Sequence, residues 1–91
     1  MNKIRRHYNF FGRVQGVGFR YTAMYAANNY SVTGWVRNEY DGTVTMELQG
    51  TEEQIDKTVQ AIRSARYIMI EKTLCRNIAV DNHETKFRVR Y

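Results

Sequence analysis

The sequence predicts an α+β fold in which two helices cover one face of an antiparallel sheet. Two observations carry this prediction. Stretches of alternating apolar residues surround two stretches with helical spacing, and an Asp-Gly turn joins the two middle strands. The predicted order is therefore β-α-β-β-α-β. The 91 residues contain no proline, linker, repeat or low-complexity segment, so we expect a single domain over residues 1–91.

The first half of the chain predicts a strand, a helix and a hairpin. Residues 4–12 are rich in alternating aromatic side chains and predict the first strand. Apolar residues at three- and four-residue spacing predict a helix over 19–30. Residues 34–38 and 43–49 predict the next two strands, and Asp41-Gly42 between them supplies the positive φ angles of a tight turn.

The second half of the chain predicts another helix and further strands. Thr51 and Gln54 have capping-box spacing ahead of an apolar helical face, which predicts the start of the second helix. Strand-like residues return over 70–80, a polar turn follows at 81–84, and alternation resumes over 87–91. Neither Gly nor Pro marks the end of the helix, so this end and the register of the fourth strand stay open.

This order packs most simply as the ferredoxin-like sandwich, which hosts enzymes as well as binding modules. The fold class alone therefore selects no function.

The charge balance favours an anionic partner. Fourteen Lys and Arg against nine Asp and Glu give a net charge of +5, but no run of five or six basic residues indicates a nucleic-acid tail. No apolar stretch approaches the roughly 20 residues that span a bilayer. The single Cys75 cannot form an internal disulfide, which suits a reducing compartment. We expect a soluble cytoplasmic protein without a membrane partner.

A glycine-rich turn between the first strand and the first helix is the candidate anion site. Gly12, Gly16 and Gly18 allow the backbone to bend sharply and to present N–H groups ahead of a helix N-terminus, and Arg20 adds a forked cation. A phosphoryl group fits such donors. The Walker pattern is excluded because neither Lys-Ser nor Lys-Thr follows the glycines. Taken alone, such a turn is also typical of an ordinary tight connection.

Two stretches together resemble a known family. Gly-Arg-Val-Gln-Gly-Val-Gly-Phe-Arg at 12–20, followed by Gly-Trp-Val-Arg-Asn at 34–38 and Asp41-Gly42, is similar to the paired signature of the acylphosphatases. The ending over 87–91 is also similar. The resemblance implies a small ferredoxin-like hydrolase that cleaves the carboxyl-phosphate bond of acyl phosphates to a carboxylate and inorganic phosphate.

The resemblance also implies a role for each site residue. Arg20 is expected to hold the phosphate oxygens, and Asn38 to fix the attacking water. The family ending further implies that the carboxylate of Tyr91 lies near Arg20. The implied enzyme needs no metal or other cofactor, acts as a monomer, and is inhibited by inorganic phosphate or sulfate as competing ligands. The backbone amides expected to complete the phosphate cradle are those of Gln15, Gly16, Val17, Gly18 and Phe19.

Two alternative functions remain at this point. One is a regulatory module that binds phosphate with little or no catalysis. The other is nucleic-acid binding, because RNA-recognition modules share the ferredoxin-like plan. Those modules carry a basic-aromatic motif on an inner strand, and residues 43–49 contain no such motif. We therefore expect no nucleic-acid partner.

Overall fold

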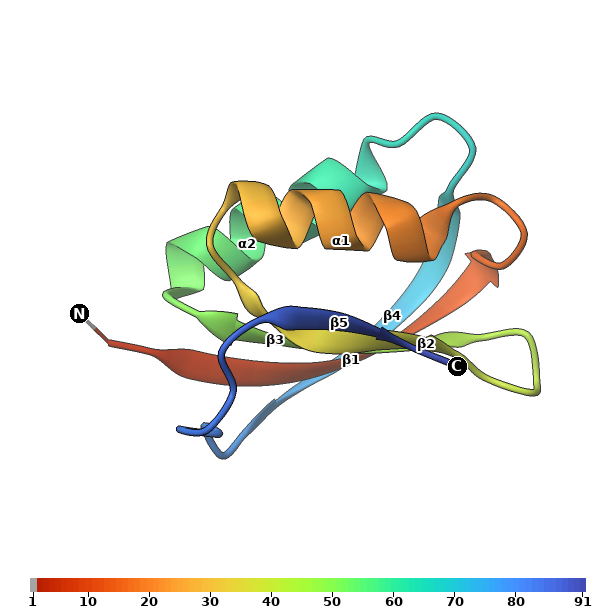
Figure 1. Cartoon of the computed structure of the whole chain (residues 1–91). Coiled ribbons are helices and arrows are strands. Elements are labelled where there is room, and N and C mark those ends of the chain that lie inside the picture. Colours follow the sequence, from red (N-terminus) through yellow and green to blue (C-terminus); the bar gives the residue numbers. More distant parts are fainter. Residues whose placement is uncertain (1) are drawn as a thin grey trace.

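The computed structural model describes residues 2–91 and contains one five-stranded sheet with two helices (Figure 1). Both helices lie on the same face of the sheet, as predicted. In chain order the elements are β1 (Ile4–Arg13), α1 (Phe19–Asn29), β2 (Thr33–Asn38), β3 (Val44–Gly50), α2 (Glu52–Arg63), β4 (Met69–Ile78) and β5 (Phe87–Arg90).

The strand order across the sheet is β4-β1-β3-β2-β5. β1, β2, β3 and β4 pair antiparallel, as expected from the sequence. β5 departs from that expectation because it pairs parallel with β2. The reason is the position of its connection: β4 ends beside the start of β1, so a chain that crosses to β2 at that end of the sheet must run in the direction of β2.

Alternation along the strands separates a helix-covered face from an open face. Tyr8 and Phe10 of β1 lie beside Met46 of β3 on the covered face, and all three side chains are buried. Such period-two burial is what the alternating sequence predicted. The same core takes in residues of α1 and α2, namely Phe19, Ala23, Ala26, Ala27, Ile55 and Ile62.

The second helix begins with the predicted capping box. The hydroxyl of Thr51 accepts a hydrogen bond from the backbone N–H of Gln54 at 3.2 Å, and the side-chain oxygen of Gln54 accepts one from the backbone N–H of Thr51 at 2.9 Å. The helix ends at Arg63, which the sequence had left open. Neither helix in residues 2–91 is long and apolar enough to cross a membrane.

A bulge between β1 and β4 sets the register that the sequence had left open. Phe11 pairs with Lys72, whereas Gly12 pairs with Ile70, so Glu71 is the extra residue of β4. Gly12 has a φ of +128°, and a Cβ atom there would lie 2.3 Å from the carbonyl oxygen of Met69. Only glycine fits this close approach, which carries the chain from β1 into the glycine-rich turn.

A buried ionic network ties the connection between β4 and β5 to the open face. The guanidinium of Arg5, 5% exposed, donates to Glu47 at 2.9 Å and to Glu84 at 2.8 Å. Gln49 accepts a hydrogen bond from the backbone N–H of Asp81 and donates to its carbonyl oxygen. These contacts hold residues 79–86 against the sheet and so fix where β5 begins.

Candidate active site

The glycine-rich turn leads directly into the open N-terminus of α1. Gly16 and Gly18 have φ values of +72° and +81°, and Gly18 is the residue that precedes the helix. Within the described residues, no side chain caps this helix end and no acidic residue lies in its first turn. The first N–H groups of α1 therefore remain available to an anion, and the partial positive charge of the helix terminus favours one.

Asn38 approaches the same place from the sheet. It is the last residue of β2 and shares the helix-covered face with Val36, whereas Trp35 and Arg37 lie on the opposite face. Arg37 stacks on Trp35 at 5.1 Å and pairs with Glu39 at 3.0 Å. Arg37 is consequently held away from the turn, although it neighbours Asn38 in sequence.

A pocket of about 160 Å³ joins these elements. It brings together five of the predicted site residues, Gly16, Gly18, Phe19, Arg20 and Asn38, and two further residues, Val14 and Tyr21. The glycine-rich turn, the β2–β3 hairpin and the end of β5 lie at one end of the molecule (Figure 1). The pocket is therefore built where three separate parts of the chain converge.

The amide of Asn38 has an unusual property inside this pocket. Its Oδ1 atom is the one buried side-chain polar atom in residues 2–91 without a hydrogen-bond partner. Buried polar atoms almost always have a partner, and an unpaired one costs about 1 to 3 kcal/mol. An orphaned acceptor that lines an anion pocket is suited to accept a hydrogen bond from a water molecule.

Gln15 and Val17 do not line the pocket with their side chains. Val17 packs against the core. The side-chain nitrogen of Gln15 donates to the carbonyl oxygens of Glu39 and Thr43, both at 2.8 Å. Gln15 thus connects the turn to the hairpin that follows Asn38, a role that the motif alone did not indicate.

The predicted turn at Asp41-Gly42 closes this hairpin. Gly42 has a φ of +92°, and Asp41 accepts hydrogen bonds from both the hydroxyl and the N–H of Thr43. Donation from the Thr43 hydroxyl, followed by donation from its N–H, lowers the pKa of Asp41. The carboxylate is therefore kept ionised, and the turn keeps its shape near neutral pH.

Arg20 supplies the positive charge of the pocket. In the part of the chain that the structure describes, no carboxylate lies within 4 Å of its guanidinium, so the expected pair with a Tyr91 carboxylate is not formed. The aromatic ring of Tyr91 lies there instead, 5.0 Å from the guanidinium carbon. The parallel direction of β5 explains this contact, because Tyr91 follows the end of that strand.

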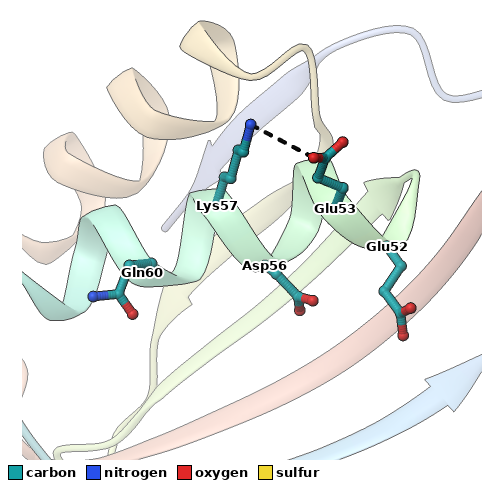
Figure 2. A pocket seen from close by; sticks show the side chains of 5 residues that line it. All are labelled: Glu52, Glu53, Asp56, Lys57 and Gln60. Carbon is teal, nitrogen blue, oxygen red and sulfur yellow. Dashed lines mark ion pairs between the residues drawn. The ribbon is translucent and has the colours of Figure 1, made fainter.

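A larger hollow on α2 is unsuitable for phosphate. It has a volume of about 510 Å³, and the carboxylates of Glu52, Glu53 and Asp56 lie along it (Figure 2). Glu52 and Asp56 are already paired with Arg6, and Glu53 with Lys57. Elsewhere in residues 2–91, no three His, Cys, Asp or Glu side chains come close enough together to hold a metal ion.

Comparison with known proteins agrees with this geometry. The acylphosphatase family model matches residues 6–89. The chain belongs to the acylphosphatase family. An acylphosphatase from Clostridium acetobutylicum is 42% identical over 81 residues, covering 88% of this chain and 89% of the relative. One from Geobacillus kaustophilus is 40% identical over 90 residues, covering 96% and 94%.

The fold of the family is also the fold of this chain. The crystal structure of an acylphosphatase from Bacillus subtilis superposes with a TM-score of 0.89 at 27% identity, covering 97% of this chain and 99% of the other. The predicted ferredoxin-like sandwich is thereby confirmed, and so is the family resemblance of the two sequence motifs.

Sequence reasoning missed Tyr21, Val14 and the Tyr91 ring as parts of the site's surroundings. Tyr21 carries a signal that could have found it, because it directly follows Arg20 at the start of a helix. The Tyr91 ring carries no such signal, since its position depends on the parallel pairing of β5.

Proposed function

We propose that this protein hydrolyses acyl phosphates to a carboxylate and inorganic phosphate in the pocket formed by the glycine-rich turn, Arg20 and Asn38. The observation that carries the proposal is the unpartnered Oδ1 of Asn38 inside a pocket that also holds a guanidinium and an open helix N-terminus. Membership of the acylphosphatase family supports the same reaction and does not favour a non-catalytic regulatory module.

The phosphoryl group binds in the turn. The backbone N–H groups from Gln15 to Phe19 donate to its oxygens, and the Arg20 guanidinium adds charged donors in a fixed fork. These donors stabilise the charge that develops on the equatorial oxygens during transfer. Because they are held by the fold before substrate arrives, little reorganisation is needed during the reaction.

Asn38 positions the nucleophile. Its Oδ1 accepts a hydrogen bond from a water molecule and aligns it opposite the acyl oxygen. The water oxygen forms a bond to phosphorus while the phosphorus–acyl oxygen bond breaks, and the carboxylate leaves with that electron pair. An amide is too weak a base to take the proton, so a phosphate oxygen of the substrate accepts it. A carboxylate leaves readily, and the reaction therefore needs no strong general acid.

The remaining expectations belong to the same proposal. The chain acts as a single domain and as a monomer in the cytoplasm, on small acyl phosphates, without a metal ion and without a nucleic-acid or membrane partner. Inorganic phosphate and sulfate compete with substrate because they fit the same cradle.

The test is hydrolysis of benzoyl phosphate by the purified protein in excess chelator. We expect turnover that chelator does not reduce, and competitive inhibition by inorganic phosphate. Clean phosphate binding without turnover would instead support a regulatory module. Inhibition that persists at saturating substrate would place the phosphate at a second site.

A further inference from the structure

The pocket is large enough for a phosphoryl group and little else. Its volume of about 160 Å³ corresponds to about five water molecules at their share of liquid volume. Phosphorus with its terminal and bridging oxygens fills that space. If the proposed function holds, the acyl group must therefore lie outside the turn, against the residues at the pocket's edge.

The side chains at that edge are aromatic. Tyr21 lines the pocket and is 68% exposed, although it stands directly beside Arg20 on α1. The ring of Tyr91, 95% exposed, lies over the Arg20 guanidinium. Neither ring is buried in the core, so neither is needed to fill it. Exposed aromatic surface beside a pocket is typical of a binding surface.

The same edge offers no second charge. Of the residues that line the pocket, Arg20 alone is charged, and its guanidinium is assigned to the phosphoryl group. An acyl group with its own carboxylate or phosphate would find no additional cation in the pocket. An uncharged planar ring can instead stack on tyrosine, at centroid separations of about 4.5 to 7 Å.

We propose that Tyr21, with the Tyr91 ring beside Arg20, forms an acyl subsite that favours acyl phosphates with an uncharged aromatic acyl group. This inference rests on the proposed function and adds the substrate class that the site prefers. Tyr21 is then a specificity-determining residue, whereas Arg20 and Asn38 act on every acyl phosphate alike.

The experiment compares kcat/KM for benzoyl phosphate and acetyl phosphate in the wild type and in Tyr21→Ala, Tyr21→Phe and Tyr25→Ala. Tyr25 is the matched control, because it is one turn further along α1 and 69% exposed but does not line the pocket. We expect the benzoyl-to-acetyl ratio to fall about three- to tenfold in Tyr21→Ala, the scale of one aromatic contact, and to stay unchanged in the other two variants. Differences in the intrinsic reactivity of the two substrates cancel when ratios are compared between proteins.

Two further readouts separate the possible outcomes. The inhibition constant of inorganic phosphate should be unchanged in Tyr21→Ala, since phosphate does not reach the subsite. The non-hydrolysable benzoylphosphonate should bind the wild type more tightly than acetylphosphonate, which tests the subsite without any variant. Equal ratios in all proteins, or an equal fall in Tyr25→Ala, would overturn the subsite. Failure of the wild type to hydrolyse either substrate would instead overturn the proposed function.

Discussion

At the scale of single residues, Arg20 and Asn38 have different tasks although they line one pocket. Arg20 binds the phosphoryl group before and during the reaction. Asn38 is needed only when a water molecule must be aligned with a bound substrate. The two residues should therefore respond differently in measurements of binding and of turnover.

Arg20→Ala should lower kcat/KM by about 10³ to 10⁵ and abolish inhibition by phosphate, because the pocket loses its one guanidinium. Arg20→Lys should restore little, since an ammonium group cannot reproduce the forked donors. Steady-state kinetics with benzoyl phosphate and a phosphate inhibition series measure both effects. Near-normal activity in Arg20→Ala would place the phosphate site elsewhere.

Asn38→Ala should lower kcat by about 10² or more and leave the phosphate inhibition constant within a few-fold. Inorganic phosphate does not require the aligned water, so its affinity should survive. Asn38→Asp places a negative charge beside an anionic ligand and should weaken phosphate binding as well. Equal losses of kcat and phosphate affinity in Asn38→Ala would show that Asn38 holds the phosphate or the turn rather than water.

Arg20 and Asn38 could be identified from the sequence because each belongs to a short motif of fixed spacing. The orphaned oxygen of Asn38 could not, because it depends on which atoms surround the end of β2 after folding. The same applies to the Gln15 side chain, which bonds to carbonyls 24 and 28 residues away. Such long-range contacts leave no periodic signal in the chain.

At the scale of elements, Gln15 links the turn after β1 to the hairpin after β2. Gln15→Leu removes both 2.8 Å hydrogen bonds at similar side-chain size. Both carbonyls keep a backbone donor, so the free energy of unfolding should fall by only about 1 kcal/mol. The position of Asn38 relative to the turn is less secure, and kcat should fall about ten- to a hundredfold.

Urea unfolding and steady-state kinetics on Gln15→Leu measure these two effects separately. Gln60→Leu on the exposed side of α2 is the control, because Gln60 is far from this hairpin in the chain and does not line the pocket. Unchanged kcat in a folded Gln15→Leu protein would mean that the turn and the hairpin hold their geometry independently.

The helices and inner strands were predictable because their apolar periodicity and capping residues act locally. β4 and β5 were less predictable for two structural reasons. The bulge at Glu71 depends on how closely the backbone passes Gly12. The parallel direction of β5 depends on where residues 79–86 cross the sheet, and this crossing is held by Arg5.

At the scale of the whole molecule, charge is divided between two sites of opposite design. The pocket keeps Arg20 unpaired for a ligand, whereas the open face of the sheet neutralises Arg5 with Glu47 and Glu84. Arg5→Leu should therefore lower the free energy of unfolding by about 3 to 5 kcal/mol, because two carboxylates lose their buried partner. Urea unfolding measures this loss, and a change below about 1 kcal/mol would show that the network contributes little.

Acid should weaken the same network in a defined direction. Burial alone would raise the pKa of Glu47, but hydrogen bonds from His7 and Arg5 outweigh burial and hold the pKa below its ordinary value. A carboxylate with a lowered folded-state pKa binds fewer protons in the folded protein than in the unfolded chain. Its stabilisation is thus complete above the unfolded pKa of about 4.3 and is lost as pH falls through the lowered value.

Glu47→Gln isolates this contribution, because other carboxylates such as Asp41 also have a lowered pKa. The wild type should be more stable than Glu47→Gln by a constant amount from pH 7 down to about pH 5, and the difference should shrink below about pH 4. Urea unfolding of both proteins across this range measures the difference. If the difference instead stayed constant down to pH 3, the Glu47 carboxylate would titrate alike in both states, and its partners Arg5 and His7 would not be what stabilises its charge.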